Sequence, residues 1–185
     1  MSFGGSGKPL GRRGFLALAA PAIVAASSLP GIARAALVPE RLLSIYNIHT
    51  GEKLTTVYHA DGVYLEAALA ELNHVLRDWR TDEVYPMETG LLDFLHDLHV
   101  KMDSAEPFHI ISGYRSPKTN AKLRNKSKGV AKRSLHMRGM AADIALPGRD
   151  IVALRKAALD MKRGGVGLYK KSGFIHVDTG RVRFW

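Results

Sequence analysis

The residues best suited to chemistry in this chain lie in two short segments that each contain a histidine. Residues 134–143 read SLHMRGMAAD and residues 173–178 read GFIHVD, so each segment combines an imidazole with a nearby carboxylate. Together His136, Asp143 and His176 offer two nitrogens and one oxygen. Three protein ligands of these types, with a fourth position open to water, are typical of a catalytic zinc ion. We therefore predict a metal site at these three residues.

The composition limits which other chemistry the chain supports. Among its 185 residues there is no cysteine, which excludes disulfides, thiolate zinc sites, cysteine nucleophiles and iron–sulfur ligation. Any metal ligand must therefore be a histidine or a carboxylate. Six further histidines lie in segments predicted as hairpin, helix or core strand, without partners at ligand spacing, and we interpret them as structural: His49, His59, His74, His96, His99 and His109.

The pattern within two predicted strands places the candidate ligands on one face. In the strand predicted over 141–146, Asp143 alternates with the apolar Ile144, and in the strand over 174–178, His176 alternates with Ile175 and Val177. Successive side chains of a strand point to opposite faces. If the two strands pair in one sheet, Asp143 and His176 meet on the same face, and His136 reaches them from the preceding loop.

The remaining segments predict the elements that position this site. We expect an α+β domain with a mainly antiparallel sheet flanked by helices, because strands and helices are mixed along the chain. No glycine-rich phosphate-binding unit is found, so nucleotide chemistry has no support. The expected elements are a hairpin over 42–59, helices over 63–80 and 88–102, a strand over 108–112, a helix from Pro117 to about Arg124, a loop to Arg133, and a helix over 150–163 that stops at Gly164-Gly165.

Residues 1–35 have the composition of an export signal. They contain four basic residues and no acid, an apolar run over 15–29, and a small-x-small cleavage site at 33–35. The pair Arg12-Arg13 favours a twin-arginine signal, with an ordinary secretory signal as the alternative. The run is shorter than the roughly 20 residues of a membrane span. We expect cleavage, a domain over 36–185 without a membrane span, a periplasmic location and transient contact with the twin-arginine translocase; a retained anchor is the alternative.

The charge of the chain changes once this signal is set aside. The formal net charge falls from +10 to +6 when the four basic residues of 1–35 are removed. For an exported protein, a moderate basic excess favours anionic polymers of the cell envelope over nucleic acid. We therefore expect no nucleic-acid partner.

With these segments the chain resembles the zinc D-Ala-D-Ala metallopeptidases of the hedgehog/D-Ala-D-Ala peptidase family, and among them the YcbK-like murein endopeptidases. The resemblance extends from about Arg41 to Trp185. It rests on residues 49–52 (HTGE), 112–120 (SGYRSPKTN), 134–143, 164–167 (GGVG) and 174–180 (FIHVDTG). It implies a hedgehog/D-Ala-D-Ala peptidase-like fold, one Zn²⁺ held by His136, Asp143 and His176, and cleavage of peptide bonds in peptidoglycan stem peptides or their cross-links.

The resemblance also implies roles for residues around the metal. Arg115 is the candidate for stabilising the oxyanion, since its guanidinium is permanently charged; a surface turn residue is the alternative. Tyr114 and Ser134 are candidates for substrate binding, and Ser134 has orientation of its loop as an alternative. The six basic residues within 122–133 are expected either to meet carboxylates of stem peptides or to form a solvated loop.

The general base is where the chain departs from several relatives. Some relatives have an acid three residues before the final histidine, a position that is Gly173 here, and others have a histidine two residues before it, which is Phe174 here. We select Asp178 as the general base, because it shares the strand face of His176. The alternative is that Asp178 orients the imidazole of His176.

These observations predict a zinc-dependent murein endopeptidase that hydrolyses peptide cross-links between stem peptides. Two alternatives stay open. The first is a carboxypeptidase or dipeptidase that releases terminal D-Ala. The second is a zinc-containing module that binds peptidoglycan without cutting it.

Overall fold

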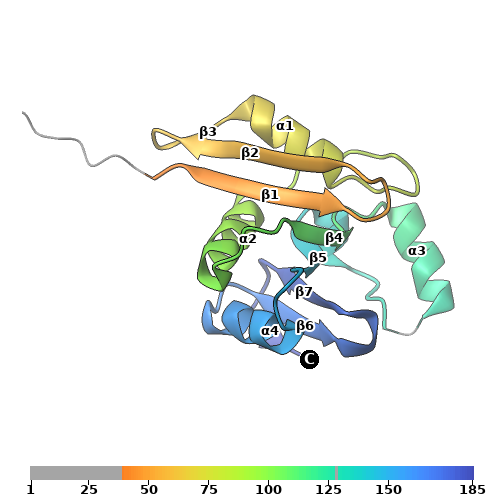
Figure 1. Ribbon diagram of the computed structural model, residues 1–185. Coiled ribbons are helices and arrows are strands. Elements are labelled where there is room, and N and C mark those ends of the chain that lie inside the picture. The colour runs from red at the N-terminus through yellow and green to blue at the C-terminus, as the bar shows by residue number, and fades with distance from the viewer. Residues whose placement is uncertain (1–38, 128) are drawn as a thin grey trace, which may run out of the picture. The chain divides into compact units, whose positions relative to one another are not determined.

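One eight-stranded sheet organises residues 39–127 and 129–185, the part of the chain that the computed structural model describes (Figure 1). The strand order is β3-β2-β1-β4-β5-β7-β6-β8, and neighbours run antiparallel except for the pairs β1–β4 and β6–β8. The predicted α+β class with a mainly antiparallel sheet is therefore confirmed. The strands are β1 (Arg41–Asn47), β2 (Lys53–Ala60), β3 (Val63–Tyr64), β4 (Phe108–Ser112), β5 (Ala141–Ala145), β6 (Gly165–Tyr169), β7 (Phe174–Asp178) and β8 (Arg183–Phe184). The export signal predicted over 1–35 lies outside the described residues.

Helices cover the sheet and bury its apolar side chains. Helix α1 (Glu66–Val75) packs on β2, α2 (Thr89–Met102) packs on β1, and α4 (Ile151–Asp160) packs on β6 and β7 and touches α2. Helix α3 (Pro117–Lys126) lies apart from these three (Figure 1). Two short 3₁₀ helices, η1 (Leu135–Arg138) and η2 (Lys170–Ser172), precede β5 and β7. No helix of the described residues is long and apolar enough to cross a membrane.

The core lies between the sheet and these helices. It includes Ile45 of β1, Ile110 of β4, Ile144 of β5, and Ile175 and Val177 of β7, all almost completely buried. Burying one such side chain contributes about 1.5–3 kcal/mol. Because Ile144, Ile175 and Val177 face the core, the residues that alternate with them lie on the other face of the sheet.

The pairing of β5 with β7 confirms the arrangement that the strand pattern predicts. The two strands run antiparallel, with Asp143 directly opposite His176 and Ile144 opposite Ile175. Both polar residues are therefore in the middle of the sheet, where neighbouring strands hold their backbone on either side.

The prediction of a long helix over 63–80 is wrong in its bounds. Val63 and Tyr64 instead pair with β2 as β3, and the helix ends at Val75. The helix is followed by Asp78, whose buried carboxylate accepts hydrogen bonds from the backbone of both the nearby Arg80 and the distant Ser116. These bonds hold the chain in a turn after the helix.

Two strands at the C-terminal end are absent from the sequence prediction. The helix predicted over 150–163 is too long at its C-terminal end, because α4 ends at Asp160. Gly165, predicted to stop this helix, instead begins β6. The segment Arg183–Phe184 then adds β8 alongside β6 as a parallel neighbour. Helix α3 also extends to Lys126, so the first part of the predicted basic loop is helical.

Candidate metal centre

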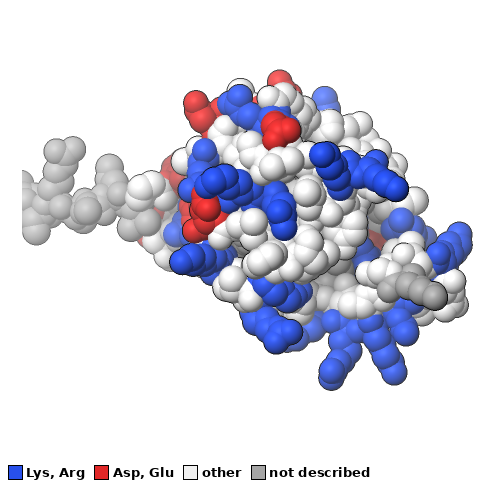
Figure 2. Space-filling model, turned by 90° about the horizontal axis from the view of Figure 1, so that it is seen from below, with Lys and Arg blue, Asp and Glu red and all other residues white. Residues whose placement is uncertain are grey.

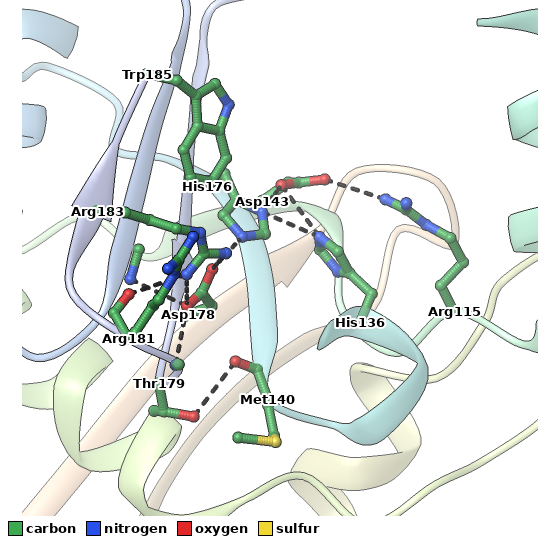
Figure 3. A network of polar contacts seen from close by, with 12 residues as sticks. Arg115, His136, Met140, Asp143, His176, Asp178, Thr179, Arg181, Arg183 and Trp185 are labelled. Atoms are coloured by element: carbon green, nitrogen blue, oxygen red, sulfur yellow. Dashed lines mark hydrogen bonds and ion pairs between the residues drawn. The ribbon is translucent and has the colours of Figure 1, made fainter. Parts of the chain in front are cut away.

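Three side chains from three elements meet on the polar face of the sheet (Figure 3). His136 comes from η1, Asp143 from β5 and His176 from β7, and all three are buried. His136 Nε2 lies 3.2 Å from His176 Nδ1 and 3.3 Å from Asp143 Oδ1, and His176 Nδ1 lies 2.9 Å from the same oxygen. The structure therefore brings together the three metal ligands that the sequence predicts.

The outer hydrogen bonds of the two imidazoles determine which nitrogens are free to bind a metal. His136 Nδ1 lies 2.7 Å from the carbonyl oxygen of Gly113, and His176 Nε2 lies 2.9 Å from Asp178 Oδ2. Because a carbonyl or carboxylate oxygen accepts, these two nitrogens donate and carry the ring protons. His136 Nε2 and His176 Nδ1 are then the nitrogens that face Asp143 Oδ1, and a cation bound between these atoms would take their lone pairs, as is typical of zinc ligands.

Local backbone geometry fixes the position of His136. Gly139 ends η1 with a φ of +67°, and a Cβ at this position would approach the carbonyl oxygen of Pro86 to 2.2 Å. The backbone of Gly139 also accepts a hydrogen bond from Glu88 N, and that of His136 accepts one from Arg115 N. Two segments of the chain, around Glu88 and around Arg115, thus hold η1 in place, and only glycine fits at its end.

Charge and burial keep His136 and Asp143 in the forms that bind metal, whereas at His176 the effect of burial is outweighed by Asp143 and Asp178, which raise its pKa. Burial lowers the pKa of His136, which favours the neutral imidazole. Burial alone would raise the pKa of Asp143, but the facing imidazoles of His136 and His176 lower it well below its usual range. A neutral imidazole and an ionised carboxylate are the forms that metal binding requires.

Asp178 lies behind His176 and is fully buried, with a relative exposure of 0%. Its Oδ2 accepts from His176 Nε2, and its Oδ1 accepts from the backbone amides of Gly165 and Gly180 at 3.0 and 2.9 Å. Arg183 donates to both oxygens. Burial opposes the charge of Asp178, yet these donors hold its pKa well below the usual range. Asp178 is therefore an ionised acceptor for the outer nitrogen of His176.

Arg115 lies on the other side of Asp143. Its Nη2 donates to Asp143 Oδ2 at 3.3 Å and to Ser112 Oγ at 3.4 Å, both long contacts. The side chain is buried, which lowers the pKa of the guanidinium, while Asp143 opposes that shift. Its Nε has no hydrogen-bond partner among the described residues. The guanidinium of Arg115 therefore lies beside the three ligands and keeps N–H groups that are available to donate further hydrogen bonds.

A cavity of about 410 Å³ opens over the ligands. Its described lining includes three arginines, Arg115, Arg133 and Arg183, but only one carboxylate, Asp143. Aromatic rings form part of its wall, and the ring centroid of Trp185 lies 5.3 Å from that of His176 (Figure 3). The cavity therefore combines a cationic lining with apolar surface.

The two predicted substrate-binding residues have different positions. Ser134 is buried and lines the cavity, two residues before His136. Tyr114 is not part of the described lining: its hydroxyl donates to Glu83 at 2.8 Å and its ring stacks on Tyr85. Burial and the neighbouring Glu83 raise the pKa of Tyr114 to about 12. The role of Tyr114 in substrate binding stays a prediction.

Sequence reasoning missed Arg183 and Trp185, which reach the site through β8. A Cβ on Gly165 would lie within 2.5 Å of Arg183 Nη1 and of Asp178 Oδ2, and a Cβ on Gly167 would lie 2.4 Å from the indole of Trp185. The two glycines of β6 thus leave room for these side chains. The alternation of glycine at 165 and 167 is the one signal in the sequence that indicates close packing on this strand.

Comparison with known proteins gives consistent matches over most of the chain. A family model described as peptidoglycan L,D-endopeptidase MepK matches residues 35–185. Peptidoglycan L,D-endopeptidase MepK of Escherichia coli strain K12 is 41% identical over 175 residues, which cover 94% of this chain and 96% of that protein. The protein of the same name from Shigella flexneri is also 41% identical. A probable peptidoglycan L,D-endopeptidase MepK of Haemophilus influenzae is 39% identical over 147 residues, 78% of each chain.

Proposed function

Because the chain belongs to the peptidoglycan L,D-endopeptidase MepK family, we propose that it hydrolyses peptide cross-links between the stem peptides of peptidoglycan with one zinc ion. The family makes it a peptidase that acts on peptidoglycan. The zinc ion is the finer part of the proposal. His136, Asp143 and His176 would hold it.

The observation that carries the zinc assignment is the convergence of three lone pairs within a buried cluster. The donor atoms of His136, Asp143 and His176 lie within 4.8 Å of one another. The outer nitrogen of each imidazole is already used as a donor, so the inner nitrogens are available as ligands. When bound, zinc lowers the pKa of a coordinated water toward ~7 and polarises a carbonyl group.

The chain's own residues supply the rest of the proposed chemistry. Arg115 is positioned to donate to the oxyanion that develops on the scissile carbonyl, and its charge needs no proton transfer to act. Removing one such donor typically costs about 10²–10³ in kcat. The contacts of Asp178 support orientation of His176 over general-base action, because Asp178 is fully buried, is not among the described residues that line the cavity, and has both oxygens occupied by donors.

The lining of the cavity supports an acidic peptide as substrate. Stem peptides carry free carboxylates, and the cavity lining offers Arg133 to them, whereas Arg115 and Arg183 pair with Asp143 and Asp178. The molecular face shown in Figure 2 carries many more Lys and Arg than Asp and Glu side chains. Such a surface favours association with an anionic polymer.

We further propose that residues 1–35 direct export to the periplasm by the twin-arginine pathway, where peptidoglycan is accessible. Replacing Arg12 and Arg13 together with lysine is expected to leave the precursor in the cytoplasm, as measured by cell fractionation. Normal export of this variant would indicate the general secretory pathway.

The function is tested by incubating the zinc-loaded protein with purified cross-linked muropeptide dimers and, separately, with monomers. Mass analysis of the products is expected to show conversion of dimers to monomers, and loss of this conversion after chelation of zinc. Release of terminal D-Ala from monomers would instead indicate a carboxypeptidase. Absence of any product from either substrate would overturn the proposal.

A further inference from the structure

Arg183 makes a two-pronged ion pair with the buried carboxylate behind His176 (Figure 3). Its Nη1 lies 3.0 Å from Asp178 Oδ1 and its Nη2 lies 2.6 Å from Asp178 Oδ2. The same Oδ2 accepts from His176 Nε2 at 2.9 Å. One oxygen of Asp178 therefore contacts both the imidazole and the guanidinium. Paired parallel bonds of this kind fix orientation as well as supplying energy.

The contacts of Asp178 saturate its capacity to accept hydrogen bonds. A carboxylate has about four lone-pair sites, and five N–H groups surround this one: two backbone amides, two nitrogens of Arg183 and Nε2 of His176. No other cation pairs with Asp178 among the described residues. Without Arg183, the fully buried carboxylate would be left with the imidazole of His176 and two backbone amides as donors. A buried charge that loses its partner is costly.

The fold provides a specific place for this arginine. Strand β8 runs parallel to β6, with Arg183 opposite Gly165, and the absence of a side chain at Gly165 leaves room for the guanidinium. Arg183 also lies over the ring of Trp185, at 5.2 Å from its centroid. Arg183 is therefore positioned by its contacts with Gly165 and Trp185 as well as by Asp178.

From this geometry we propose that Arg183 is a positioning residue for the metal ligand His176, acting through Asp178. Arg183 holds the carboxylate of Asp178 in place, Asp178 accepts from Nε2 of His176, and Nδ1 of His176 stays directed at the metal position. Outer partners of metal-binding histidines typically contribute 10–100-fold to metal affinity. The inference rests on the proposed zinc site.

The test compares zinc affinity across matched variants by competition with a chromophoric chelator, without any peptidase assay. Arg183→Ala is expected to weaken zinc binding by about 10-fold, and Arg183→Lys by less, since lysine restores the charge but not the paired bonds. Arg181→Ala is the matched control, because this exposed arginine contributes only its backbone carbonyl to the network. It is expected to bind zinc like the unmodified protein.

A double variant separates action through Asp178 from a general structural role. If Arg183 acts through Asp178, adding Arg183→Ala to Asp178→Asn weakens zinc binding no further than Asp178→Asn alone. Additive losses, or equal affinity of the Arg183→Ala and Arg181→Ala variants, would overturn the inference. Thermal unfolding of each variant without metal identifies any that fail to fold, in which case Arg183→Lys carries the comparison. Absence of zinc binding by the unmodified protein would instead contradict the proposed zinc site.

Discussion

The two histidines of the candidate metal centre are held in different ways. His136 lies on a single turn of 3₁₀ helix, and a backbone carbonyl, that of Gly113, fixes its outer nitrogen. His176 lies within a central strand, and a side chain, that of Asp178, fixes its outer nitrogen. Asp178 is in turn held by the side chain of Arg183, whereas the carbonyl of Gly113 is held by the backbone to which it belongs. The orientation of one imidazole thus depends on backbone conformation, and that of the other depends on two charged side chains, Asp178 and Arg183.

This difference shows how each half of the site responds to substitution. A backbone carbonyl cannot be removed by mutation, so the His136 side is sensitive mainly to changes in chain conformation. The His176 side depends on hydrogen bonds that single substitutions weaken in steps. We therefore expect abrupt losses on the first side and graded losses on the second.

The largest effect is expected from removing either imidazole. His136→Ala and His176→Ala are each expected to abolish zinc binding and hydrolysis of muropeptide dimers together, because two remaining ligands do not make a catalytic zinc site. Zinc content after dialysis and product analysis measure the two losses. His74→Ala is the control, since His74 is exposed and, within the described part of the chain, its side chain pairs with Glu52 alone. A zinc-free His136→Ala variant with full activity would refute the assignment.

Gly139→Ala tests the conformational side of the comparison. Alanine at a φ of +67° costs about 1–2 kcal/mol, and here its Cβ also meets the carbonyl of Pro86. We expect a larger loss in the free energy of unfolding than for Gly51→Ala, which has a similar φ of +78° but no neighbour within 4 Å. Denaturant unfolding measures both. Equal losses in the two variants would show that η1 shifts away from Pro86 with no further loss in the free energy of unfolding.

Asp178→Asn tests the side-chain half and distinguishes the two roles considered for Asp178. Orientation of His176 predicts zinc binding weaker by about 10–100-fold. A general base predicts unchanged zinc affinity with hydrolysis slowed by about 10²-fold or more. Chelator competition and single-turnover rates at saturating zinc separate these outcomes. Asp160→Asn, at an exposed carboxylate paired with Lys156, is the control.

The smallest effect is expected at Ser134. Its hydroxyl lines the cavity beside His136, and one neutral hydrogen bond to substrate contributes about 0.5–1.5 kcal/mol. Ser134→Ala is therefore expected to raise KM by roughly 2–10-fold with little change in kcat. If KM is unchanged and zinc affinity falls, Ser134 serves to orient the loop that holds His136.

Local alternation was enough to predict the centre of the site. The apolar residues at 144, 175 and 177 indicate which strand faces are buried, and they place Asp143 and His176 on the same face if the two strands pair in one sheet. The pairing itself, with Asp143 opposite His176, comes from the structure. Short-range periodicity shows which residues lie on the opposite, polar face, because the apolar face of such a strand packs on the core.

The parts that the sequence did not predict depend on contacts between distant segments. Arg183 and Trp185 reach the site only because β8 pairs with β6, and a two-residue strand has no pattern of its own. The turn after α1 likewise depends on Asp78 binding the backbone of Ser116, 38 residues away along the chain. Neither partner is specified by spacing or propensity, so neither could be found without the tertiary structure.

The attachment of β8 has a thermodynamic consequence. The amide of Trp185 donates to Val166, and its carbonyl accepts from Leu168, so the residue is fastened to β6 by main-chain bonds. Linkage is reciprocal: if docking of β8 strengthens metal binding through Arg183, metal binding strengthens the docking of β8 by the same free energy. The exchange of the Trp185 amide with deuterated solvent would then slow when metal is added. The exchange rate of this amide on the β6–β8 edge would then indicate whether the metal centre is occupied.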